Sequence, residues 1–203
     1  VWGVDVEASP SEGTRVGKLQ NKKGGPDSGS IATALAEAYE VATRNPDVKF
    51  AIPTLMGNTL IHQTIVGLEA QRQLAAVNEA PDHVIGSIGA GSHFGGLIAP
   101  FVPARIQGQN TRFVAIEEAS SPSLTRGVYT EESADAAGLM PQVPMYTLGR
   151  DYAPPGVLAG AMRYHGVAPI VSSLYREKYI EAVAHGQIES YSAGLMFTRA
   201  EGI

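Results

Sequence analysis

A glycine-rich turn carries the clearest chemistry in this sequence. The run from Gly86 to Gly96 reads GSIGAGSHFGG and follows an apolar stretch that predicts a strand. Glycine lets the backbone turn tightly and approach an anion without a Cβ in the way. Successive N–H groups at the start of a following helix can then hold a phosphate, and the Ser92 hydroxyl can add a hydrogen bond. The turn therefore predicts a cofactor or substrate that carries phosphate.

The same turn is compatible with several roles, which differ in what it would bind. On local grounds it could serve only to let a helix pack closely on a sheet. A Rossmann dinucleotide loop needs the pattern G-x-G-x-x-G, but Phe94 stands where the third glycine should follow Gly89 and Gly91. Glu117 and Glu118 lie too far along to supply the acidic residue of that motif. A P-loop is excluded because G-K-[ST] is missing. The turn favours one phosphate group held by backbone.

The elements that would position this turn alternate between helices and strands. A helix is predicted over Ile31–Arg44, because apolar residues recur every three or four positions, Ser30 can cap its start and Asn45-Pro46 ends it. The next predicted elements are a strand at Val48–Ile52, a helix at Leu60–Val77, a strand at His83–Ile88, a helix body at Leu97–Val102 and a strand at Arg112–Ile116. This alternation predicts an α/β fold with a parallel sheet and flanking helices.

Two stretches lack a sustained period. Gly17–Gly29 is rich in Gly and Lys and is predicted to be an exposed loop. Glu118–Pro155 is rich in Ser, Pro, Gly and acidic residues, so we expect a long loop of the functional or disordered kind. The remaining predicted elements are a helical or irregular segment at Val167–Tyr175, a strand at Ile180–Ala184 and an amphipathic helix at Gln187–Ala200.

Composition limits the class of protein. The 203 residues suit one domain or two small lobes, and a hydrophobic content of 44% can build a core. The net charge is −5 and the charges are scattered, so no basic face for nucleic acid is expected. No apolar run approaches the roughly 20 residues of a membrane helix, and the start has no secretory leader pattern. We expect a cytoplasmic protein, which the absence of cysteine fits, and the first residue, Val1, suggests a fragment.

Several segments together resemble one enzyme family. Gly89 to His93, called the cup below, resembles the phosphate loop G-G-G-S-N of tryptophan synthase β chains. The segments that resemble the standalone type of this chain are His62–Ala70 (HQTIVGLEA), Met145–Pro155 (MYTLGRDYAPP) and Arg163–Pro169 (RYHGVAP). The end, Thr198–Ile203 (TRAEGI), resembles the family's R-T-E-G-I, and weaker matches occur at Ser9–Ser11 and Gly29–Ala32. The matches follow one order along the chain and are more specific than one glycine loop.

The resemblance implies a fold-type II pyridoxal-phosphate enzyme. Such a lyase condenses L-serine with indole through an aminoacrylate, giving L-tryptophan and water. The residues whose backbone would hold the cofactor's phosphate are Gly89, Ala90, Gly91, Ser92 and His93. Asp151 matches the aspartate that faces the substrate's reacting side chain. Carbonyls near Gly89, Tyr152 and Pro154 lie where some members hold a monovalent cation. Members are usually homodimers, and whether an α chain takes part stays open.

Two departures from the family's loop concern the cup. Ala90 replaces its middle glycine, which is acceptable if φ stays negative, because the cup uses N–H groups that any non-proline residue supplies. His93 replaces its final Asn and is interpreted as a neutral donor, with added positive charge near the phosphate as the alternative.

The lysine that forms the Schiff base is missing. The family places it after Ser-His in an early segment, and the lysines of this chain, which are Lys18, Lys22, Lys23, Lys49 and Lys178, lack that context. Lys178 is expected to cap the end of a helix. We therefore expect residues 1–203 to be a partial domain without the early lysine segment and the C-terminal end, with no catalytic residue assigned and no activity alone.

The histidines do not predict a metal site. Their spacing lacks a metal-ligand pattern, and structural roles are expected for most of them, which include His62, His83, His93 and His185. His165 is the exception, because its motif is expected near a substrate entrance or a domain interface. No Ser-His-Asp order stands out, and Glu131-Glu132 is interpreted as solvated charge.

Two further functions remain open at this level. A threonine synthase or serine/threonine dehydratase of the same fold is one alternative, although the Met145–Pro155 and Arg163–Pro169 segments argue against it. A non-catalytic phosphate-ligand or partner-binding domain that lost the lysine is the other. The coding sequence on either side of this chain would separate the enzyme from the non-catalytic domain.

Overall fold

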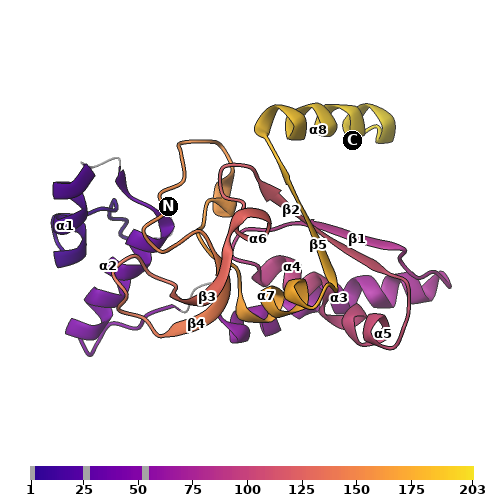
Figure 1. Cartoon of the computed structure of the whole chain (residues 1–203), viewed down its shortest axis with the longest axis horizontal. Coiled ribbons are helices and arrows are strands. Elements are labelled where there is room, and N and C mark those ends of the chain that lie inside the picture. Colours follow the sequence, from indigo (N-terminus) through magenta and orange to yellow (C-terminus); the bar gives the residue numbers. More distant parts are fainter. Residues whose placement is uncertain (1–2, 25–27, 52–54) are drawn as a thin grey trace.

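The computed structural model describes residues 3–24, 28–51 and 55–203 (Figure 1). Its helices are α1 (Arg15–Gly24), α2 (Ile31–Arg44), α3 (Gly57–Ala76), α4 (Ser92–Ile98), α5 (Val102–Ile106), α6 (Ser123–Arg126), α7 (Pro169–Arg176) and α8 (Gln187–Glu201), with short 3-10 turns η2 (Ala99–Phe101) and η3 (Gly160–Met162). Its strands are β1 (His83–Ser87), β2 (Arg112–Glu118), β3 (Val128–Ser133), β4 (Gln142–Thr147) and β5 (Ile180–His185). Among these residues, no helix is both long and apolar enough to span a membrane.

A parallel sheet in the order β1-β2-β5 forms the centre of the larger part of the molecule. Val84 pairs with Phe113, which pairs with Ile180, and all three side chains are buried on one face. Helices α3, α4 and α7 cover that face and contribute buried residues such as Phe94 and Val171 to its core. The predicted α/β fold with a parallel sheet and flanking helices is confirmed.

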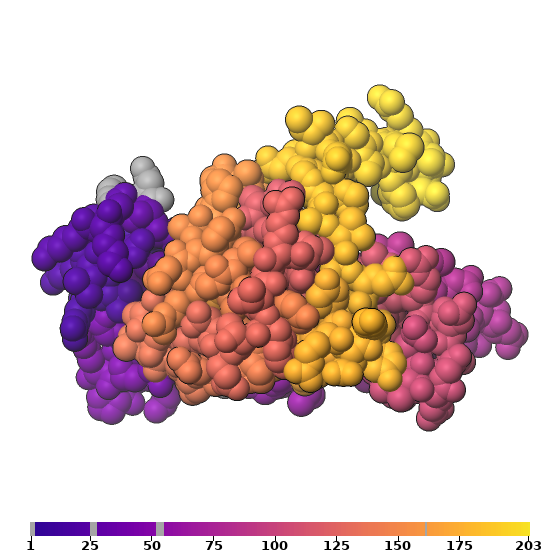
Figure 2. Space-filling model, viewed as in Figure 1, coloured from indigo at the N-terminus to yellow at the C-terminus, as the bar shows by residue number. Residues whose placement is uncertain are grey.

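The opposite face of this sheet is open. Ile85 on β1 is 61% exposed and Val183 on β5 is 41% exposed. Parallel strands normally have both faces covered, so this face is unusual for its type. Helix α8 follows β5 and has no buried residue. It stands away from the body on the side of the strands opposite α3 and α7, as Figures 1 and 2 show.

A smaller part packs α2 against the antiparallel pair β3-β4, in which Thr130 is opposite Met145. Its core contains Ala32, Leu55, Met145 and Tyr164. The prediction of a long loop over Glu118–Pro155 was therefore wrong. Strand β3 is mostly exposed, so its sequence carries little apolar alternation, and its pairing with β4 is what defines it.

The prediction of an exposed loop over Gly17–Gly29 was also wrong, because residues up to Gly24 lie in α1. This helix is polar, and tertiary contacts hold it. The Glu40 carboxylate accepts the N–H groups of Arg15 and Val16 at its start, at 2.8 and 2.9 Å. Gly17 is buried so close to Ser11 that an added Cβ would lie 2.1 Å from the Ser11 carbonyl oxygen. Residues 25–27 of the predicted loop lie outside the described residues.

The predicted strand at Val48–Ile52 does not form over residues 48–51, and Ile52 lies outside the described residues. No strand lies beside it among the described residues to complete its hydrogen bonds. Instead, the Val48 N–H bonds back to the Asn45 carbonyl, and the Phe50 ring packs edge-on against Tyr39, with 5.6 Å between centroids. The segment therefore extends the end of α2 as irregular backbone.

Several helix ends follow the sequence signals. Helix α2 has the predicted bounds, and the Ser30 hydroxyl caps it by accepting the Thr33 N–H. Lys178 ends α7 with a φ of 64°, and its N–H bonds to the Tyr175 carbonyl, which confirms its predicted capping role. The predicted helix body at Leu97–Val102 spans parts of α4, η2 and α5.

Candidate functional site

The cup lies at the carboxyl end of β1. The Ile88 N–H donates to the Ile116 carbonyl of β2 at 2.9 Å, so the last residue before the cup is still tied to the sheet. The chain then turns and enters α4 at Ser92. Gly91 caps that helix with a φ of 99°, a conformation that L side chains rarely adopt. Ala90 does not have positive φ, so the condition on which alanine was acceptable is met.

The backbone donors of the cup are available to a ligand as far as the described residues show. Within the described residues, no hydrogen bond is donated by the backbone N–H groups of Gly89 to His93. The Ser92 side chain is buried and that of His93 is exposed. Unpaired N–H groups that follow a strand and open a helix are suited to hold an anion. The residues present therefore fit a phosphate group.

Helix α3 packs closely against α4, the helix that begins at the cup. A Cβ at Gly67 would lie 2.4 Å from the Leu97 carbonyl oxygen, and one at Gly96 would lie 2.5 Å from the backbone of Gln63. The two helices therefore touch backbone to backbone. The motif at His62–Ala70 supplies this contact, so its resemblance to the family has a structural counterpart.

The segment Arg163–Pro169 borders the cup on another side. The Ala168 N–H donates to the Ala90 carbonyl at 2.8 Å. The segment is also tied to β4, because Gly166 forms a bridge with Thr147 and the Val167 N–H donates to the Tyr146 carbonyl at 3.0 Å. The cup, the Met145–Pro155 segment and the Arg163–Pro169 segment, far apart in the sequence, thus meet in one region.

His165 is buried where these segments meet. Its Nδ1 lies 2.9 Å from the Thr147 hydroxyl and its Nε2 lies 3.3 Å from the Ala134 carbonyl oxygen. Burial lowers the pKa of His165, and it outweighs the hydrogen bond to Ala134 and the nearby carboxylates, including Asp151, which act in the opposite sense. The ring is therefore neutral at physiological pH.

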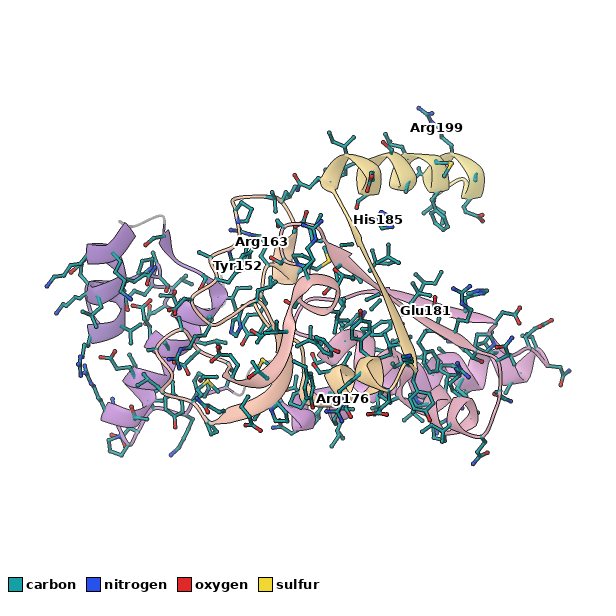
Figure 3. All side chains as sticks on the ribbon, viewed as in Figure 1. Tyr152, Arg163, Arg176, Glu181, His185 and Arg199 are labelled. Carbon is teal, nitrogen blue, oxygen red and sulfur yellow. The ribbon has the colours of Figure 1, made fainter. Side chains whose placement is uncertain are left out.

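Asp151 lies in the turn after β4 and is exposed. The Tyr152 N–H closes this turn by donating to the Gly149 carbonyl at 2.9 Å. The Arg163 guanidinium donates to the Pro154 carbonyl at 3.1 Å, and Figure 3 shows Tyr152 and Arg163 in the loops of this region. The Arg163 guanidinium, a cationic donor, is thus hydrogen-bonded to one of the carbonyls that the family resemblance implied as ligands of a monovalent cation.

The lysines are all exposed side chains, and they are Lys18, Lys22, Lys23, Lys49 and Lys178. Lys178 lies in the turn between α7 and β5, and the others lie on or after α1 and α2. Within the described part of the chain, no lysine joins the network of backbone bonds that surrounds the cup. The described residues therefore offer no lysine amine at the cup that could attack an aldehyde.

Glu117 is a buried residue that its sequence context did not single out. It is the last residue but one of β2, at the same sheet edge as the cup, and is only 2% exposed. Its carboxylate accepts the N–H groups of Leu124 and Thr125 at 2.6 and 3.0 Å. Burial raises the pKa of Glu117, against these hydrogen bonds. Its place at the carboxyl end of a predicted parallel strand was the signal that could have identified it.

The chain is similar in sequence to known proteins along its whole length, although no family model matches it. It is 44% identical over 203 residues to "Tryptophan synthase beta chain 2" of Thermotoga maritima, covering 100% of this chain and 48% of the relative. It is 43% identical over 205 residues to "Tryptophan synthase beta chain" of Pyrobaculum islandicum, covering 100% of this chain and 48% of the relative. The chain thus spans about half the length of the curated relatives it matches.

A solved crystal structure of a threonine deaminase from T.th. is similar in part. It has a TM-score of 0.49 and 19% sequence identity, and the match covers 70% of this chain and 45% of that chain. A likeness at this level carries no conclusion about function. The sequence resemblance to the β chains, in contrast, is confirmed over the whole of this chain.

Proposed function

We propose that this chain, which is homologous along its whole length to tryptophan synthase β chains, is the cofactor-cradling part of a pyridoxal-phosphate-dependent lyase. The reaction is the condensation of L-serine with indole to give L-tryptophan and water. The observation that carries the proposal is the cup at the end of a parallel strand, whose backbone N–H groups have no acceptor among the described residues, in a chain that matches these enzymes.

In this proposal the chain's own residues bind and orient. The N–H groups of Gly89 to His93 hold the phosphate, and the positive φ of Gly91 turns the chain so that they converge. Asp151 faces the substrate and accepts a hydrogen bond from the serine hydroxyl. Pyridoxal phosphate, when bound, supplies the electron sink for chemistry at the substrate's Cα.

A monovalent cation is part of the family resemblance and would need carbonyl ligands near Gly89, Tyr152 and Pro154. A cation at the Pro154 carbonyl would have to displace the Arg163 guanidinium, which donates to it at 3.1 Å. Like charges so close repel each other, so cation binding at this carbonyl and the Arg163 hydrogen bond exclude one another. The homodimer remains a proposal for the parent protein.

The reactive lysine is not supplied by these residues. No lysine lies at the cup among the described residues, so in this proposal the amine that the chemistry needs comes from polypeptide outside the 203 residues. The chain alone is therefore expected to bind pyridoxal phosphate weakly and to form no tryptophan. L-serine and indole are the substrates of the complete protein in this proposal.

The proposal is tested by following the backbone amides of the chain by NMR during addition of pyridoxal phosphate, inorganic phosphate or pyridoxal. Both phosphates should shift the amides of Gly89 to His93, and pyridoxal, which lacks phosphate, should not. An absence of shifts at the cup would refute the assignment. A protein-bound absorption band that survives removal of free pyridoxal phosphate, and that borohydride converts into a covalent adduct on one lysine, would refute the absence of a reactive lysine.

The second candidate is a non-catalytic phosphate-ligand domain of the same fold. The observation in its favour is the exposure of every lysine. The two candidates differ in the coding sequence that precedes the chain, where the enzyme requires an S-H-K-x-N segment. Its presence supports the lyase, and an uninterrupted reading frame without it supports the non-catalytic domain.

A further inference from the structure

The hydrogen bonds of His165 fix one form of its ring. The Ala134 carbonyl can only accept, so the Nε2 that faces it must carry the proton. Nδ1 then accepts from the Thr147 hydroxyl at 2.9 Å. The same hydroxyl accepts the Gly149 N–H at 2.9 Å, so it both donates and accepts. A neutral imidazole with its proton on Nε2 satisfies all of these partners, and the lowered pKa of His165 favours this form over the imidazolium.

The backbone around His165 connects two parts of the candidate site. The His165 carbonyl accepts the Leu148 N–H at 2.7 Å, which ties the residue to the turn that leads to Asp151. Three residues later, the Ala168 N–H donates to the Ala90 carbonyl of the cup. A Cβ on Gly91 would lie 3.1 Å from Val167, so the cup also rests on this segment sterically.

The side chain of His165 also forms a hydrogen bond to a third segment, the end of β3. Ala134 follows β3 and is fully buried, and the Tyr164 hydroxyl donates to the same Ala134 carbonyl. The Tyr164 and His165 rings are 4.5 Å apart between centroids. The ring of His165 thus links the end of β3, the end of β4 and the Arg163–Pro169 segment, and its hydrogen bonds go to residues outside the cup.

We propose that His165 is a positioning residue, whose fixed neutral ring sets the placement of the phosphate cup relative to Asp151 through the Thr147 hydroxyl and the Ala168 N–H. The proposal rests on the proposed function for the ligand that the cup takes. The linkage itself is a property of this chain. His165 acts through Thr147, Gly149 and Ala168, and no proton transfer to substrate is assigned to it.

The test compares Thr147→Val with Thr147→Ser in the whole 203-residue chain. Valine has nearly the shape of threonine but no hydroxyl, so it leaves His165 Nδ1 and the Gly149 N–H without a partner. Serine keeps the hydroxyl and serves as the rescue variant. Thr130→Val is the matched control, because it removes the same hydroxyl group from a threonine that is exposed on β3. His165→Asn, which removes the imidazole ring itself, is a further and independent variant.

The readouts are amide hydrogen exchange, imidazole nitrogen NMR and phosphate affinity. We expect Thr147→Val to speed exchange of the Ala168 N–H about tenfold and to weaken binding of inorganic phosphate about tenfold. The Ile88 N–H, bonded to Ile116 in the sheet, should keep its rate and so exclude global destabilisation. The wild-type His165 ring should show the Nε2–H form at neutral pH.

Wild-type exchange at Ala168 in Thr147→Val, or a His165 ring that carries its proton on Nδ1, would overturn the proposal. Equal loss in Thr147→Val and Thr147→Ser would do the same, because the hydroxyl would then be irrelevant. These results can be told from a failure of the proposed function. If the wild-type cup binds no phosphate, the function assignment fails, while the exchange of Ala168 still decides the role of His165.

Discussion

The close contact between α3 and α4 makes Gly67 a sensitive position. A Cβ there would lie 2.4 Å from the Leu97 carbonyl oxygen and 2.7 Å from that of Gly96, whereas ordinary contact begins at 3.4 Å. Both atoms are backbone, so no side chain can rotate away. Helix α4 would have to move by about 1 Å to admit the methyl group. Because α4 begins at the cup, the same movement would displace the N–H groups that we propose bind phosphate.

The expected cost of Gly67→Ala combines two opposing terms. Overpacking a closely packed contact costs about 1–3 kcal/mol. Alanine returns about 0.5–1 kcal/mol through its better helix propensity. We therefore expect a net loss of about 1–2 kcal/mol in the free energy of unfolding, measured by urea denaturation, and a weaker response of the cup amides to inorganic phosphate.

Gly194→Ala is the matched control for this substitution. Gly194 lies inside α8, and a Cβ there would meet nothing within 4 Å. With no overpacking to oppose it, the propensity term alone predicts no loss of stability and stronger helix signals from α8. A Gly67→Ala chain as stable as the wild type, with an unchanged cup, would refute the close contact and its link to the cup.

Three further outcomes follow from named contacts. Gly91→Ala should lower phosphate affinity about tenfold without unfolding the chain, because alanine at a φ of 99° costs about 1–2 kcal/mol, and titration of the cup amides measures this. The folded-state pKa of His165 lies below its ordinary 6.5, so the stability that this residue contributes is present above pH 6.5 and is lost as pH falls below it. Denaturation of the wild type and of His165→Asn at several pH values should therefore show the stabilities of the two proteins converging in acid. The paired substitution Leu195→Glu and Phe197→Glu should leave the urea midpoint unchanged, since these side chains are 61% and 60% exposed and lose no core packing.

The sequence predicted those elements whose own burial pattern repeats along the chain. Helix α2 shows its period of three to four residues together with its capping residue Ser30, and β2 is an apolar run flanked by polar residues. Helix α1 and strand β3 could not be found this way. The first depends on Glu40 and on the space around Gly17, and the second depends on pairing with β4, so both are determined by residues distant in sequence.

The candidate site divides in the same way. The glycines of the cup predict a tight turn, and in the structure the N–H groups of that turn have no acceptor among the described residues. The burial of His165 could not be predicted, because histidine occurs as readily on a surface, and its partners Thr147 and Ala134 lie 18 and 31 residues away. Spacing within a motif therefore indicated the anion site, but only the fold shows which residues hold the motifs together.

The placement of charge at the sheet edge separates two tasks of the proposed enzyme. The cup follows β1 and Glu117 is the last residue but one of β2, so both lie at the carboxyl ends of parallel strands, where ligands of open α/β sheets bind. The Glu117 carboxylate accepts the N–H groups of Leu124 and Thr125 and, as an acceptor, offers nothing to an anion, so the donors at this edge are those of the cup. The five lysines lie on or after α1 and α2 and before β5, so we expect this edge to hold a phosphate but not to bind an aldehyde covalently. Phosphate affinity and covalent chemistry should therefore be separable. Adding a lysine-bearing partner segment should restore the covalent chemistry without strengthening phosphate binding.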